Sequence, residues 1–157
     1  MKIDVNVGLD EYEGIGTSES DFMFNNWSDL KLANGTLSLD LWGAEFFTSA
    51  LGTKIKEALK HRAFTFVDTD IYINGKTTFT FHNVRKITKS NGEILLKADE
   101  KDKEGTSYVI GGALPNTNLF DELTIEADEM FEMIFDTDDF ISVEEYCKNP
   151  KEYSYHK

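Results

Sequence analysis

The sequence predicts a β-rich α+β fold, with a mainly antiparallel sheet shaped as a half-barrel or a sandwich. The first supporting observation is three Asn-Gly pairs, each flanked by segments in which apolar and polar residues alternate. Asn-Gly tolerates the positive φ angles of a type I′ turn, so it is a strong hairpin signal. The second observation is one period-four apolar stripe, which predicts a helix packed on a face of the sheet.

The three predicted hairpins pair residues 29–33 with 36–42, residues 70–73 with 76–82, and residues 84–88 with 93–98. Apolar residues recur in them at every second position, which is typical of strands with one buried face. Leu37, Leu39 and Leu41, for example, share one face of the first hairpin. The same alternation predicts further strands at residues 2–7, 63–67, 107–110, 122–127 and 130–135.

Two helices are predicted. The first carries an apolar residue at every fourth position, namely Phe47, Leu51, Ile55 and Leu59. Gly52 interrupts this stripe, so the helix could begin only at Thr53, which is a suitable N-cap. A short C-terminal helix is predicted by the capping-box spacing of Ser142 and Glu145, and Pro150 marks its end.

The chain is predicted to form a single domain over residues 1–157, because no linker divides it. Residues 148–157 could form a flexible tail. Cys147 is the only cysteine, so no disulfide can form within the chain. The N-terminus has no signal-like apolar run, and no stretch approaches membrane-spanning length. We therefore expect a cytoplasmic protein that does not enter membranes.

Negative charge is concentrated near the C-terminus. The net charge is −13 and the isoelectric point is about 4.5. Residues 104–147 hold twelve of the 29 acidic residues and none of the 16 basic ones. Such a chain repels nucleic acid and anionic lipid, and it attracts basic proteins over long range. The base-free window is either a surface for a basic partner or a face that only keeps the protein soluble.

The sequence predicts no catalytic residue, metal ligand or cofactor. Its three histidines lack partners at the spacing that a zinc site requires. Cys147 lies beside Glu144 and Glu145, whose charge disfavours the thiolate that a nucleophile needs. The acidic segments 99–105 and 136–139 depart from the calcium-binding EF-hand pattern.

The leading hypothesis is a non-catalytic, immunity-type inhibitor that neutralises a basic toxin such as a nuclease. A nuclease is basic where it grips phosphate, so its inhibitor gains association rate and specificity by presenting carboxylates there. The candidate partner-binding residues are acids of the base-free window: Asp121, Glu122, Glu126, Asp128, Glu129, Glu132, Asp136, Asp138 and Asp139.

Two other classes remain open. One is a structural β-module, or a module that binds a carbohydrate or an apolar small molecule. Its cavity would be lined by Phe64, Phe66, Phe79 and Phe81, although these side chains also suit a hydrophobic core. The other class is a hydrolase that uses two carboxylates from distant sequence positions, but no feature of the sequence selects such a pair.

Overall fold

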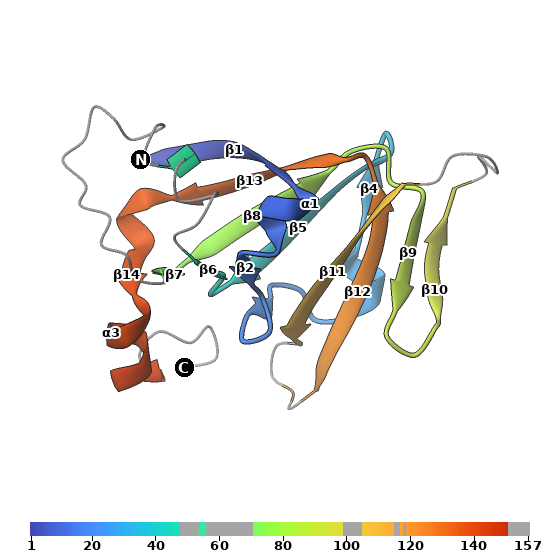
Figure 1. Cartoon of the computed structure of the whole chain (residues 1–157). Helices are drawn as coiled ribbons and strands as arrows, with labels where there is room; N and C mark the ends of the chain where they lie inside the picture. The colour runs from blue at the N-terminus through green and yellow to red at the C-terminus, as the bar shows by residue number, and fades with distance from the viewer. Residues whose placement is uncertain (48–53, 56–70, 99–104, 115–116, 118, 151–157) are drawn as a thin grey trace.

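The computed structural model describes residues 1–47, 54–55, 71–98, 105–114, 117 and 119–150 (Figure 1). Most strands belong to one ten-stranded mixed sheet. Its order is β1 (Lys2–Gly8), β13 (Met130–Asp136), β8 (Lys76–Phe81), β5 (Thr36–Trp42), β3 (Asp21–Phe22), β11 (Thr106–Ala113), β12 (Phe120–Ala127), β9 (Lys86–Lys89) and β10 (Ile94–Lys97), with β4 (Leu32–Ala33) beside β5.

A second, four-stranded antiparallel sheet lies at one end of the first. Its order is β14 (Phe140–Ser142), β7 (Ile71–Ile73), β6 (Glu45–Phe46) and β2 (Ile15–Gly16). The helices whose full extent the structure describes are short: α1 (Leu9–Tyr12), η1 (Trp27–Asp29), η2 (Thr137–Asp139) and α3 (Val143–Lys148). None of the helices that the structure describes has the length and apolarity to span a bilayer.

The large sheet bends into two layers (Figure 1). Strands β1, β13, β8 and β5 form one layer, and β11, β12, β9 and β10 form the other. The two-residue strand β3 joins them, because it pairs antiparallel with β5 and parallel with β11. Strands β1 and β10 end the sheet without meeting, so it does not close into a barrel. The predicted β-rich, largely antiparallel architecture is confirmed at this level.

The two layers meet through aromatic rings on their inner faces. Phe131 of β13 stacks on Phe81 of β8 with ring centroids 4.9 Å apart. Tyr108 of β11 meets Phe131 edge-on at 5.0 Å, and all three side chains are fully buried. Each such pair contributes about 0.5–1.5 kcal/mol beyond the area that it buries. This cluster therefore ties the layers together at the centre of the core.

The first and third predicted hairpins are confirmed. β4 and β5 pair across Asn34 and Gly35, which have φ angles of 55° and 77°, as a type I′ turn requires. β9 and β10 pair across a longer loop, in which only Gly92 has a positive φ angle. The Gly92 N–H donates to the Lys89 carbonyl at 2.9 Å. This loop is a turn followed by a left-handed glycine rather than a type I′ turn.

The second predicted hairpin is wrong, because β7 and β8 lie in different sheets. β7 pairs with β6 and β14, whereas β8 pairs with β5 and β13. Every residue of β7 is buried, so this strand needs partners that cover both of its faces. Gly75 follows it where Asp139 packs close: a Cβ atom at Gly75 would lie 2.3 Å from the Asp139 carboxylate. The glycine thus serves close packing, not a hairpin turn.

The remaining predicted elements have mixed outcomes. Strands β1, β11, β12 and β13 form where the alternation predicts them, and α3 is capped by Ser142, whose hydroxyl accepts the Glu145 N–H at 3.2 Å. The strand predicted at 63–67 lies outside the described residues. The predicted helix does not begin at Phe47, which is exposed, is not helical and donates its N–H to the Gly14 carbonyl at 2.7 Å. Lys54 and Ile55 are helical, in keeping with the alternative start at Thr53, and Ile55 is buried in the core. The residues on either side of those two, and the tail 151–157, lie outside the description.

Replacing Phe131 by alanine should lower the free energy of unfolding by about 3–5 kcal/mol, because it empties the centre of the aromatic cluster. Urea denaturation measures this change. The control is Leu119→Ala, at a side chain that is 64% exposed, which should change the free energy by less than about 0.5 kcal/mol. Equal effects of the two substitutions would contradict the central position of Phe131.

A candidate acidic partner-binding groove

The nine predicted acids do not form one continuous surface. Asp128, Glu129 and Glu132 gather at the turn between β12 and β13. Glu122 and Glu126 project from the outer face of β12, and Asp121 lies beside the β9–β10 turn. The other three, Asp136, Asp138 and Asp139, lie at the far end of β13. Because the inner faces of the layers pack together, the outer faces of β12 and β13 point in opposite directions. The base-free window is therefore divided among several sites.

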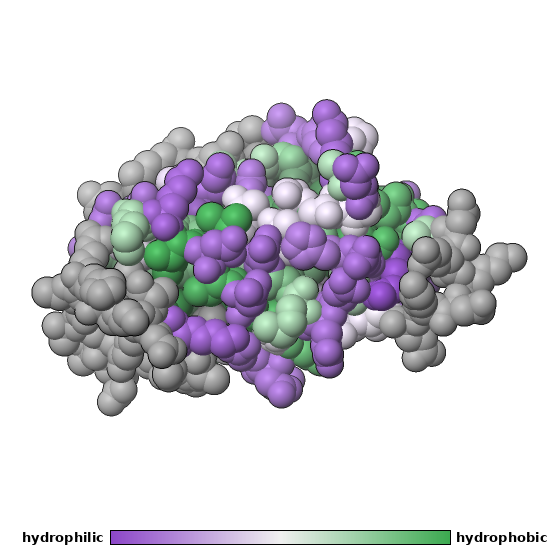
Figure 2. Space-filling view, turned by 90° about the horizontal axis from the view of Figure 1, so that it is seen from above, coloured by the Kyte–Doolittle hydropathy of each residue, from purple (hydrophilic) through white to green (hydrophobic). Residues whose placement is uncertain are grey.

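The acids at the β12–β13 turn line an open groove of about 540 Å³. Asn6, His82, Asp128, Glu129, Met130, Phe131 and Glu132 form its walls. Strand register brings these residues together, since Glu132 of β13 lies opposite Asn6 of β1 on one side and Thr80 of β8 on the other. His82 directly follows β8, so it also lies at the groove. Figure 2 shows the molecule from the side of β1 and β13, where hydrophilic residues surround smaller apolar patches.

Two carboxylates of the groove have little internal compensation for their charge. The nearest basic atom recorded for Glu132 is His82 Nε2, at 3.5 Å, and that contact is an ion pair only when the imidazole is protonated. In the part of the chain that the structure describes, no ion pair or hydrogen bond is recorded for the Glu129 carboxylate. Both side chains are accessible to solvent. They can therefore accept an ammonium or guanidinium group from outside.

Asp4 adds negative charge beside the groove. Surrounding protein atoms remove water from this carboxyl group and Glu132 repels it, so its pKa lies above the ordinary value of 3.8. The nearby His82 lowers the pKa of Asp4, but by less than these two effects raise it. Burial is the larger cause of this shift, and the repulsion from Glu132 is the part that an incoming cation would relieve.

Asp128 has a structural role at the rim of the groove. Its carboxylate accepts a hydrogen bond from Asn83 Nδ2 at 2.7 Å. It also forms an ion pair with Arg85, whose Nη2 lies 3.3 Å away. Its backbone N–H donates to the His82 carbonyl at 3.0 Å. These bonds hold the β12–β13 turn against the segment between β8 and β9. Asp128 therefore shapes the groove, while Glu129 and Glu132 supply the accessible charge.

The acids at the far end of β13 are largely used within the chain. The terminal ammonium of Met1 contacts Asp136 at 2.8 Å and Asp138 at 3.3 Å. The hydrogen bond from this ammonium and that from the Asp138 N–H lower the pKa of Asp136. Asp139 is partly desolvated and is repelled by both neighbouring acids, so its pKa is raised. This cluster is separate from the groove.

Among the other predicted acids, Glu126 and Asp121 lie near basic or hydroxyl groups. Glu126 sits directly opposite Lys86 in the pairing of β12 with β9, and Glu122 is on the same outer face. Partial burial tends to raise the pKa of Asp121, but hydrogen bonds from the Ser90 hydroxyl and the Glu122 N–H, together with Lys89, lower it overall. Glu126 and Asp121 are thus less suited to receiving an external cation.

Sequence reasoning missed Asp4, Asn6 and His82. They come from the first strand and from the end of β8, far along the chain from Glu132. Only the order and register of β1, β13 and β8 bring them together, and the alternation pattern carries no signal for strand order. Among the described residues, no group of three or more His, Cys, Asp or Glu side chains could hold a metal ion. Phe79 and Phe81 are fully buried in the core, and Phe64 and Phe66 lie outside the description.

Comparison with known protein families, curated proteins and solved structures found no match to this chain. The groove itself offers carboxylates that are open to solvent, an imidazole and an apolar wall formed by Met130, which is 43% exposed. Such an arrangement can bind a long cationic side chain, whose methylene stem packs on Met130 while its charged end meets Glu129 and Glu132.

Asp4→Asn should raise the melting temperature at pH 7. A raised pKa in the folded state means that ionised Asp4 opposes folding, and this penalty is absent once the pH falls below 3.8, where the carboxyl is protonated in both states. The gain should therefore shrink towards zero between pH 7 and pH 3. Thermal denaturation across this range, with the exposed Glu19→Gln as a control of equal charge, measures it. A destabilising effect of Asp4→Asn at pH 7 would refute the electrostatic reading.

Proposed function

We propose that this protein is a non-catalytic, immunity-type inhibitor whose acidic groove receives a Lys or Arg side chain of a basic toxin, such as a nuclease. The observation that carries the proposal is the convergence of Glu129 and Glu132 on one groove, where, among the described residues, Glu132 has an ion-paired contact with His82 alone and Glu129 has none. Five of its seven lining residues, 128–132, belong to the base-free window of the sequence.

Electrostatics supports a cationic partner. Two unit charges 4 Å apart interact with roughly 4 kcal/mol at the effective dielectric of a protein surface, and the interaction strengthens as the partner excludes water. A guanidinium group can bind carboxylates through two parallel hydrogen bonds, which also fixes its orientation. A basic side chain that enters the groove would relieve the repulsion between Glu132 and Asp4.

The overall charge of −13 supports a role in fast capture. Long-range attraction between an acidic inhibitor and a basic toxin raises the association rate, and this gain falls as salt increases. Nucleases carry basic residues where they hold the phosphate backbone. An inhibitor that covers those residues with carboxylates would block substrate binding without any chemical step.

The test compares two double variants with the same change in net charge. A basic protein captured from the native host is first remade in recombinant form, and its affinity is then measured by calorimetry at low and high salt. Glu129→Gln with Glu132→Gln should weaken binding at least about tenfold, which corresponds to about 1.4 kcal/mol. The control, Glu122→Gln with Glu126→Gln on the opposite outer face, should weaken it less than about threefold.

Inhibition of the partner's own activity is the second measurement, and it should follow the affinity of each variant. Equal losses from the two double variants would mean that overall charge, not the groove, determines binding. An unchanged affinity in the groove variant at low salt would refute the proposal.

A further inference from the structure

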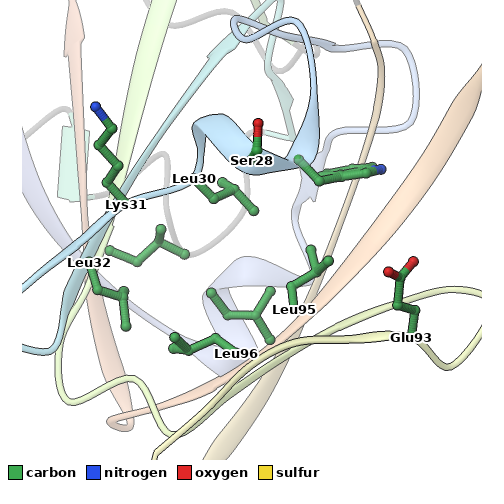
Figure 3. Close-up of a pocket in the computed structure, with 10 residues that line it drawn as sticks. Ser28, Leu30, Lys31, Leu32, Glu93, Leu95 and Leu96 are labelled. Carbon is green, nitrogen blue, oxygen red and sulfur yellow. The ribbon is translucent and has the colours of Figure 1, made fainter.

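A second cavity of about 400 Å³ opens between the two layers, and it shares no residue with the acidic groove. One wall is the segment that contains η1 and β4, and the opposite wall is the β9–β10 hairpin (Figure 3). The residues that line it are Trp27, Ser28, Leu30, Lys31, Leu32, Leu37, Ile87, Glu93, Leu95 and Leu96.

Apolar side chains that the core leaves partly exposed gather at this cavity. Seven such side chains among the described residues pack against the core, and five of them line the cavity: Trp27, Leu30, Leu32, Leu95 and Leu96. In Figure 3 the four leucines lie around a common space. Exposed apolar groups that converge in a concave site are typical of ligand pockets, and the volume lies in the usual range for a small molecule.

The walls of the cavity are held in place by the fold. Trp27 packs edge-on against the buried ring of Phe22 at 5.5 Å, and Asn26 caps the turn by accepting the Ser28 N–H at 3.0 Å. On the opposite wall, the register of β10 shifts between Ile94 and Leu96, which is a β-bulge. A bulge changes the direction of successive side chains, so both Leu95 and Leu96 can face the cavity. The site is therefore preformed.

The charges at the rim are already compensated or directed elsewhere. Lys89 pairs with Glu93 at 3.1 Å and lies 5.6 Å from the centre of the Trp27 ring. The Ser28 hydroxyl hydrogen-bonds to Asn26. In Figure 3 the amine of Lys31 points away from the leucines. A charged group buried among these leucines would lose its hydration without gaining a partner, which is strongly unfavourable.

We propose that this cavity is a binding site for a small, uncharged molecule with an aliphatic chain. The leucine walls bury the chain, and Trp27 covers one end of it. This site is independent of the acidic groove, so either proposal can fail while the other stands.

The probe is 1-octanol, and the signals are Trp27 fluorescence and melting temperature. The chain has two tryptophans, so Trp42→Phe leaves Trp27 as the only one. Saturable binding of 1-octanol should shift the emission of Trp27. It should also raise the melting temperature of the unmodified protein, because a ligand that binds only the folded state stabilises it. Octanoate and octylammonium, which have the same chain with a charge, should bind at least tenfold more weakly.

Neighbouring residues of β10 supply a matched pair of variants. Leu95→Asn should weaken octanol binding at least tenfold, whereas Ile94→Asn should change it less than twofold, because Ile94 is 50% exposed and does not line the cavity. Leu32→Phe fills the cavity with apolar atoms, so it should abolish binding even if Leu95→Asn fails to fold. Non-saturable binding, equal effects of the two asparagine variants, or octanoate binding as tight as octanol binding would overturn the proposal.

Discussion

The contact of Tyr108 with Phe131 and Phe81 is the interaction on which the rest of the structure depends. It joins the two layers of the large sheet, which in the described residues share strand pairing only through the two residues of β3. Without this aromatic packing, the layers would share few hydrogen bonds and their inner faces would be exposed to water. The packing also determines which surfaces are outward, and so it sets the positions of the acidic groove and the apolar cavity.

The alternation of apolar and polar residues predicted most of the strands because burial of one face imposes that pattern directly. It predicted strand pairing less well. Asn74-Gly75 has the sequence of a hairpin turn, but the buried strand β7 before it is completed by β6 and β14, and Gly75 is needed for contact with Asp139. Pairing is decided by partners distant in sequence, so a local turn signal cannot determine it.

The candidate site was predictable only in part for the same reason. The base-free window pointed to Glu129 and Glu132, which line the groove, and also to acids that are paired elsewhere in the fold. Asp136 is held by the terminal ammonium and Glu126 faces Lys86. Separating accessible from compensated carboxylates requires strand register. The cavity between the layers was likewise hidden, because leucines at its walls have the same sequence pattern as leucines in a closed core.

Because the large sheet is open, the negative charge of the protein also affects its tendency to aggregate in concentrated solution. β1 and β10 are the end strands of the described sheet, and an end strand offers unpaired backbone groups on which another chain can add. At neutral pH the charge of −13 on each copy keeps such edges apart. Near the isoelectric point of about 4.5 that repulsion disappears. The same carboxylates that would attract a basic partner therefore also protect the protein from edge-to-edge aggregation, and its solubility is lowest in mildly acidic solution.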